Sequence, residues 1–411
     1  MRAGLFGIIR GMKNSYPKLA VVCAALSASA LFADVPEIKW GRVNVKEGQP
    51  VSADEAKQAR AAFDADGRSS PERATLIFKK SDQATIAAVV AAFPEASSVD
   101  AKYCKIDDIS VFAALANLKE ADFYGSTVND FAPLAACKKL AKLGYYAVKA
   151  PQAVYDSIAS IKSLKELTGG LSGVESVAFV KDLPQLEYFS VFAESVGDLD
   201  SIGGAVGLKH VKLWNLDGRP LSGRKIPEAG DLKFLAACTK LEKIELPGSA
   251  YTDLESLAGL KNVKYLDLSA AVNDIDLAFA KDYGKLTFVT TRLARGKVSG
   301  LEALAGKPVE KIDLDGDFDA DLSFLKDCAK LKTLSISAAS PKKTRSIANF
   351  KAAAGMSSLA SLTAIGTNGI DFDTIKSLPN LSSLTVLKGA LTAEQIAELK
   401  SAKPKIRITE R

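Results

Sequence analysis

A repeat of about 22 residues constrains the fold of this chain more than any other feature, because repeats of this length are units that stack into elongated arrays. Its signature is three apolar residues at relative positions 0, 3 and 5, as in Leu331, Leu334 and Ile336. The first of the three is called the anchor below. Successive anchors lie 22, 24, 22, 22, 33, 22, 23, 23, 22, 28 and 22 residues apart. The anchors are Leu118, Leu140, Leu164, Leu186, Leu208, Leu241, Val263, Leu286, Val309, Leu331, Leu359 and Leu381.

Each unit has two halves with different periodicities. Apolar and polar residues alternate after the anchor, which predicts a β-strand. Twelve residues past the anchor, five units carry an Asp followed by apolar residues one and four positions later, which predicts a short capped helical turn. These aspartates are Asp130, Asp198, Asp253, Asp321 and Asp371. A strand and one turn cannot bury their own apolar face, so the units must stack into an α/β solenoid.

This pattern resembles the leucine-rich-repeat family, specifically its bacterial 22-residue, internalin-like class, over residues 70–411. The resemblance implies a curved array with a parallel β-sheet on the concave side, short helical turns on the convex side, and a role in recognising other molecules. One feature departs from the family, which places Asn eight residues past the anchor. Here that column holds Ser126, Val148, Ser172, Glu194, Leu216, Ser249, Ala271, Ala294, Asp317, Ala339, Thr367 and Gly389. The departure bears on loop packing and curvature, not on the class.

The first 33 residues have the pattern of a secretory signal peptide. Lys13 and Lys18 precede an apolar stretch over residues 19–26, and small residues ending at Ala30 or Ala33 offer cleavage sites. Met12 is an alternative start, and a retained N-terminal anchor is an alternative to cleavage. We therefore expect an exported protein, in the periplasm, secreted or at the cell surface, with no transmembrane span in its mature form.

The sequences at the two ends of the array are typical of caps that cover its terminal apolar faces. Residues 34–95 form an N-terminal cap region with a degenerate repeat at Leu76 and Phe78 and predicted helices at 53–63 and 81–92. The array itself occupies residues 96–390. Residues 391–411 form a C-terminal cap, where Thr392 and Gln395 make a capping box. The helix that they open runs to about residue 402, and a last strand follows. The role of residues 34–70 stays open between cap, linker and partner-binding element.

Charge and cysteine placement exclude several classes of function. Without residues 1–33 the chain has 50 Lys and Arg against 48 Asp and Glu, which gives no electrostatic reason to expect a nucleic-acid partner. Cys137, Cys238 and Cys328 each lie three residues before an anchor, four repeats apart, or about 19 Å along the stack. We therefore expect these thiols and Cys104 to be reduced, buried side chains, without disulfides or a metal site.

Catalytic and cofactor motifs are weak, so no enzyme activity and no cofactor are expected. His210 is the only histidine, Ser190 lies on the neighbouring strand, and no carboxylate is clearly placed to orient the imidazole. The run from Asp313 to Asp321 looks like a calcium loop. Its register assigns those carboxylates to outward strand positions and to a helix cap, and its glycine is misplaced for an EF-hand.

The outward positions of the central strands are rich in aromatic residues. Six residues past the anchor these are Tyr124, Tyr146, Gly170, Phe192 and Trp214, and two residues past it they are Tyr188, His210, Lys243, Tyr265 and Phe288. Parallel stacking predicts one aromatic patch on the concave face, whereas the same columns toward the C-terminus hold Ser and Thr. The 33-residue spacing adds an insertion next to Trp214 that contains Arg219 and Arg224, further candidate binding residues.

We therefore expect a binding protein that recognises a protein, peptide or glycan through this aromatic concave surface. Aromatic residues also suit strands and pack across them, so the structural alternative is a passive envelope component whose aromatic face packs in an oligomer. A monomeric mature protein with the patch exposed would favour recognition.

Overall fold

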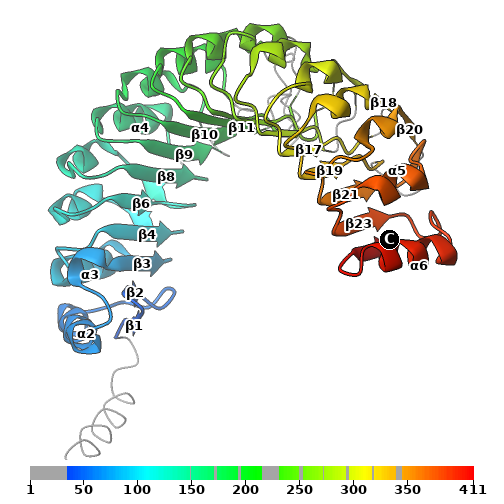
Figure 1. Cartoon of the computed structure of the whole chain (residues 1–411). Helices are drawn as coiled ribbons and strands as arrows, with labels where there is room; N and C mark the ends of the chain where they lie inside the picture. Colours follow the sequence, from blue (N-terminus) through cyan, green and yellow to red (C-terminus); the bar gives the residue numbers. More distant parts are fainter. Residues whose placement is uncertain are drawn as a thin grey trace, which may run out of the picture.

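The computed structural model describes residues 35–411 except 149, 171–173, 193–195, 215–230, 250–252, 272, 293–295, 317–318 and 339–344. The chain forms an arch with strands along its inner side and helical turns along its outer side (Figure 1). The expected signal segment, residues 1–33, lies outside the described residues, as does the insertion with Arg219 and Arg224. None of the described helices is long and apolar enough to cross a membrane.

A 17-stranded sheet lines the concave side of the arch. Its strands pair in chain order and in parallel, except for an antiparallel hairpin of the first two. They are β1 (Glu37–Lys39), β2 (Arg42–Asn44), β3 (Thr75–Lys79), β4 (Ser98–Lys102), β6 (Glu120–Asp122), β8 (Lys142–Tyr146), β9 (Glu166–Gly170), β10 (Tyr188–Phe192), β11 (His210–Trp214), β12 (Lys243–Glu245), β13 (Tyr265–Asp267), β15 (Phe288–Thr290), β17 (Lys311–Asp313), β19 (Thr333–Ser335), β21 (Ser361–Ala364), β23 (Ser383–Val386) and β24 (Arg407–Glu410).

The register of this sheet follows the anchors. Tyr188 pairs with His210, and Phe192 pairs with Trp214, so residues at equal distances past their anchors lie side by side. Inward residues fill the core between the sheet and the turns, and Leu213 is 0% exposed. The predicted strand faces and the predicted parallel solenoid are therefore confirmed.

The convex side carries mostly 3-10 helices, because each unit has room for only one or two turns. Asp371 caps its turn as predicted, since its carboxylate accepts a hydrogen bond from the Thr374 amide at 2.8 Å. Asp198 instead accepts from the Val177 amide of the preceding unit at 2.7 Å. The turns are η3 (Ile109–Ala114), η4 (Ala132–Ala136), α4 (Gln152–Asp156), η5 (Ser157–Ser160), η6 (Ala178–Asp182), η8 (Leu199–Gly204), η9 (Lys233–Ala237), η10 (Leu254–Leu257), η11 (Leu277–Asp282), η12 (Leu301–Leu304), η13 (Ser323–Asp327), η14 (Phe350–Ala353) and α5 (Phe372–Ser377).

Short parallel ladders join neighbouring units between the sheet and the turns. The column that holds Asn in the family contributes here through Ser126, whose buried hydroxyl accepts from the Cys104 amide and donates to the Ala101 carbonyl. The ladders are β5 (Lys105–Ile106) with β7 (Thr127–Val128), β14 (Ile275–Asp276) with β16 (Val298–Ser299), and β18 (Ala320–Asp321), β20 (Arg345–Ala348) and β22 (Thr367–Asn368).

The helices predicted at both ends are present. They are α2 (Ala53–Asp66), α3 (Gln83–Ala92) and α6 (Ala393–Ala402), and η2 (Pro71–Arg73) precedes β3. The Thr392 capping box opens α6 as expected. The β1–β2 hairpin was not predicted. Its turn places Trp40 in the left-handed region with φ 49°, ahead of Gly41.

All four cysteines of the described chain are free and buried, as the repeat register predicted. Burial raises the pKa of Cys238 and of Cys328 to about 11, so both are protonated at neutral pH.

Candidate binding surface on the concave sheet

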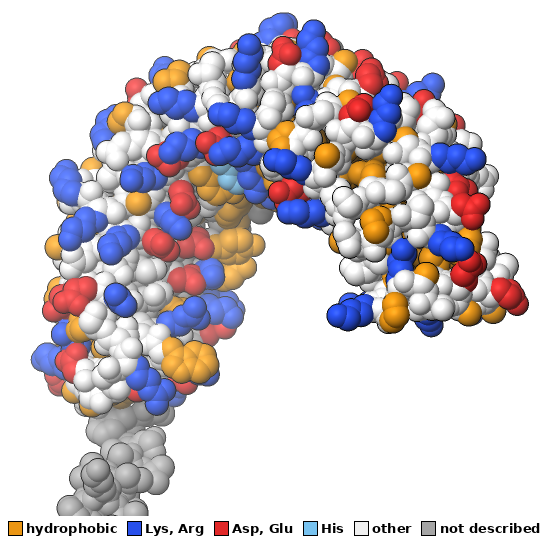
Figure 2. All heavy atoms as spheres, in the orientation of Figure 1, with side chains coloured by type: hydrophobic (Ala, Val, Ile, Leu, Met, Phe, Trp, Pro, Cys, Tyr) orange, Lys and Arg blue, Asp and Glu red, His pale blue; other side chains and the backbone are white. Residues whose placement is uncertain are grey.

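The predicted aromatic side chains project from the middle of the concave sheet and are half-buried against one another. In the space-filling view the single histidine lies among hydrophobic side chains on the inner face of the arch, with Lys and Arg around them (Figure 2). The aromatic side chains and His210 form three separate groups on this face rather than one continuous patch.

The first group combines Tyr146, Phe192 and Trp214. The Phe192 and Trp214 rings stack with centroids 5.6 Å apart and planes 12° from parallel. Tyr146 meets Phe192 edge-on at 5.9 Å although strand β9 lies between them. The residue that pairs with Tyr146 on β9 is Gly170, so no side chain separates the two rings there.

The second and third groups lie two residues past the anchors. Tyr188 stacks on His210 with centroids 4.1 Å apart. Tyr265 stacks on Phe288 at the same separation of 4.1 Å. In the third group, the stacked pair of Tyr265 and Phe288, a lysine covers the outer face of each ring. The Lys243 ammonium lies 4.5 Å from the Tyr265 ring, and the Lys311 ammonium lies 5.2 Å from the Phe288 ring. The ring faces are therefore occupied, and the ring edges and the ammonium groups are left for a partner.

Glu245 links the groups. Its Oε1 accepts from His210 Nε2 at 2.6 Å and from the Lys243 ammonium at 2.8 Å, and its Oε2 lies 3.2 Å from the Lys212 ammonium. Lys212 in turn lies 4.2 Å over the Trp214 ring. One buried carboxylate thus holds His210 and two lysine ammonium groups against the aromatic rings.

The electrostatics of this cluster keep Glu245 ionised. Burial raises the pKa of Glu245, but hydrogen bonds from His210 and Lys243 and the charge of Lys212 outweigh burial and bring it to about 2. Because the carboxylate only accepts, the His210 Nε2 carries the proton in their bond. Burial and the charge of Asp267 raise the pKa of Tyr265 to about 12, so its hydroxyl is neutral.

One sequence-based expectation about His210 needs correction. The expectation that no carboxylate orients His210 is wrong, because Glu245 does so. Ser190, the hydroxyl that the sequence places on the strand next to His210, is buried and shares a hydrogen bond with the Tyr146 hydroxyl at 3.0 Å. Aligning the repeats by their anchors could have identified Glu245. It lies on β12, the strand next to that of His210, and is four residues past its anchor where His210 is two residues past its own.

The patch predicted at its N-terminal end also differs. Tyr124 does not join Tyr146 but meets Tyr103 edge-on at 5.4 Å. Tyr103 is 49% exposed and lies just past β4, in a unit that the anchor pattern missed.

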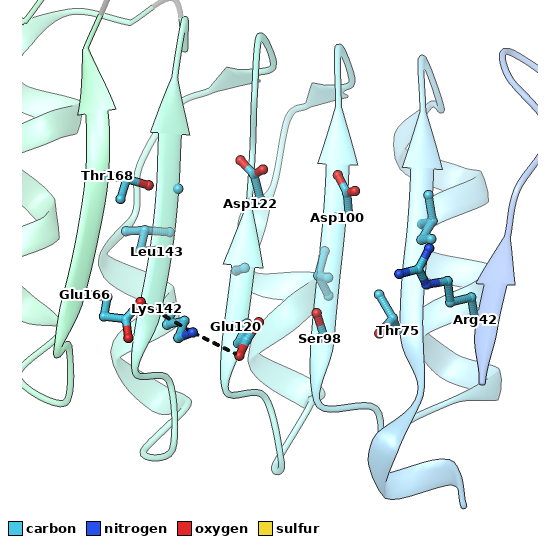
Figure 3. Close-up of a pocket in the computed structure, with 14 residues that line it drawn as sticks. Arg42, Thr75, Ser98, Asp100, Glu120, Asp122, Lys142, Leu143, Glu166 and Thr168 are labelled. Atoms are coloured by element: carbon cyan, nitrogen blue, oxygen red, sulfur yellow. Dashed lines mark ion pairs between the residues drawn. The ribbon is translucent and has the colours of Figure 1, made fainter. Parts of the chain in front are cut away.

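A polar pocket of about 440 Å³ hollows the concave face beside this surface, across β2 to β9 (Figure 3). Along its lower edge Lys142 lies between Glu120, at 3.6 Å, and Glu166, at 3.4 Å. Asp100 and Asp122 line its upper part. Burial and the nearby charge of Asp100 raise the pKa of Asp122.

The aspartate run begins at Asp313, the last residue of β17, and among the described residues no group of three or more His, Cys, Asp or Glu is placed to bind a metal ion. Asp317 lies outside them. Burial, followed by the charge of Asp315, raises the pKa of Asp313 to about 6. Asp315 accepts hydrogen bonds from the Ser335 hydroxyl and the Ser337 amide, each at 2.7 Å.

The fold is that of a leucine-rich-repeat solenoid, and it is similar to solved internalin structures. A solved internalin, inlF of Listeria monocytogenes, is 15% identical with a TM-score of 0.57, over 81% of this chain and 88% of that one. A leucine-rich-repeat protein of Leptospira interrogans is 14% identical with a TM-score of 0.54, over 97% of this chain and all of that one.

The receptor in the TLR13–ssRNA13 complex is 16% identical with a TM-score of 0.56, over 82% of this chain and 52% of that one. No family model matches the sequence, and none of the curated proteins compared with it does. At these identities the similarities show the fold, while the partner must be inferred from the surface.

Proposed function

We propose that the protein is an exported recognition protein that binds a protein or peptide segment on the concave surface of β8 to β17. The observation that carries this proposal is the clustering of six aromatic rings, His210 and three lysines on one accessible face. Tyr and Trp are common anchors of interfaces, and a surface of this composition is seldom left without a partner.

A peptide suits this surface better than a glycan. Sugar rings stack on free aromatic faces, whereas the rings here stack on each other and under lysines. One structural neighbour is held in a complex with RNA. The near-neutral charge of the chain after residue 33 does not support such a partner here.

The test is affinity capture from the native extracellular surroundings with the immobilised mature protein. A specific partner should be retained by the wild type and lost with Trp214→Ala. Thr333→Ala, at the same sheet face on the Ser- and Thr-lined strand β19, is the matched control and should retain the partner. Sedimentation should show a monomer. Capture unaffected by Trp214→Ala would contradict the proposal, and an oligomer that buries Trp214 would favour the envelope-component alternative.

A further inference from the structure

The centre of the concave surface has its negative charge beneath its positive charges. The Glu245 side chain is 8% exposed, whereas those of Lys212 and Lys243 are 22% and 37% exposed. An approaching molecule therefore meets two ammonium groups before it meets the carboxylate that holds them.

These two ammonium groups keep donors for a ligand. An ammonium has three N–H donors, and each lysine pairs with a single oxygen of Glu245. Each ammonium also lies over a ring, Lys212 over Trp214 and Lys243 over Tyr265. The ion pairs and the rings hold both groups in place, so little side-chain entropy remains to be lost on binding.

The outward carboxylate on the neighbouring strand β13, Asp267, does not use these donors. Asp267 pairs with Glu245 across the sheet, and its Oδ1 accepts from the Ser269 amide at 2.8 Å. Within the described residues it makes no ion pair with Lys212 or Lys243. Among the described residues no second carboxylate takes these donors, so they are available to a carboxylate of another molecule.

We propose that the partner presents a carboxylate to Lys212 and Lys243, with an apolar or aromatic side chain beside it against the ring edges of Trp214 and Tyr265. This inference rests on the proposed function and names the chemistry of the partner. A carboxylate can accept from both ammonium groups at once through its two oxygens. Glu245 is the positioning residue, because it holds the two like charges together and above the sheet.

The carboxylate can be an acidic side chain or the end of a chain, and one experiment separates these sources. Random peptides displayed with either a free or a blocked C-terminus are selected on the full mature protein. The affinity of each selected peptide is then measured by titration calorimetry, alongside a version with Glu→Gln or Asp→Asn and a version with an amidated C-terminus. We expect acid-containing peptides, and a roughly tenfold or greater loss of affinity when the critical carboxylate is neutralised.

Protein variants connect this loss to the site. In Lys212→Gln/Lys243→Gln the acidic peptide should bind weakly and its neutral version equally weakly, so the difference between them disappears. Lys332→Gln removes a lysine that pairs with Glu310 at 2.9 Å on the rim of the same sheet, and it should change neither affinity. Glu245→Gln should lower the affinity for the acidic peptide several-fold, because the lysines are held less firmly. The acidic peptide should still bind more tightly than its neutral version, because both lysines are still present.

Peptides that depend on Trp214 but bind equally well when neutralised, or a selection without acidic peptides, would overturn this inference and leave the proposed surface intact. Peptides that bind Trp214→Ala as tightly as the wild type would reject the surface itself.

Discussion

Adjacent residues on β11 separate the contribution of the concave surface to stability from its contribution to binding. Leu213 points into the core and is 0% exposed, whereas Trp214 points outward from the same strand. Truncating each to alanine therefore tests the strand faces and the proposed surface with one pair of variants.

The expected magnitudes follow from the contacts. Leu213→Ala leaves a cavity between sheet and turns and should cost about 2–5 kcal/mol of unfolding free energy. Trp214→Ala leaves no core cavity, but it loses the Phe192 stack at 5.6 Å and the Lys212 contact at 4.2 Å. Those contacts contribute about 1–2 kcal/mol together. Its effect on binding should be larger, since loss of a buried aromatic anchor contributes about 2 kcal/mol, or roughly 30-fold in affinity.

Urea unfolding followed by circular dichroism measures the first quantity, and titration of the captured partner measures the second. Leu213→Ala should lower the urea midpoint of unfolding more than Trp214→Ala does, and the folded variant should bind the partner with normal affinity. Trp214→Ala should lower the midpoint only a little but weaken partner binding strongly. If Trp214→Ala unfolds the protein and Leu213→Ala is silent, the strand faces are inverted. If both variants fold and both bind, the partner lies elsewhere.

Three further results are expected. Gly170→Ala should destabilise the protein by roughly 1–3 kcal/mol and weaken partner binding, because its φ is 104° and a Cβ would collide with the Phe192 backbone; unchanged urea midpoints would contradict this. The raised pKa of Asp313 means that its contribution to stability is complete below pH 3.8 and is lost as the pH rises through about 6, so Asp313→Asn should raise the melting temperature at pH 8 and not at pH 4. An equal effect at both pH values would refute it. Thiol titration should find few reactive groups in the folded protein and four once the mature chain is unfolded without reductant, whereas two or fewer would reveal a disulfide.

The repeat register could be predicted because three apolar positions per unit decide which face of each strand is buried. A shift of one residue would have turned Leu213 outward and Trp214 inward, so the pattern tolerates no other register. The shortness of the helical segments could also be predicted, because a repeat of 22 residues leaves space for little more than a strand and one helical turn.

Lateral contacts were harder to predict. His210 and Glu245 are 35 residues apart because the long insertion falls between their strands, and they meet diagonally rather than in one column. The β1–β2 hairpin was not predicted because its turn lacks the usual sequence signal. Its two-residue turn is Trp40–Gly41, whereas Asn or Asp before Gly is the usual signal for such a turn.

The C-terminal strands show that this sheet does not require the charged aromatic cluster for folding. Four residues past the anchor, the position that Glu245 occupies on β12, strands β19, β21 and β23 carry Ser335, Thr363 and Thr385, and they pair in the same register. Burying a carboxylate such as Glu245 costs desolvation energy that its partners must offset, and a Ser or Thr at that position avoids this cost. Because the same protein builds an equivalent sheet without that cost, stability alone does not account for Glu245 and the lysines it holds. The proposed recognition of a partner would account for them, since it requires two like charges to be fixed side by side on an accessible surface.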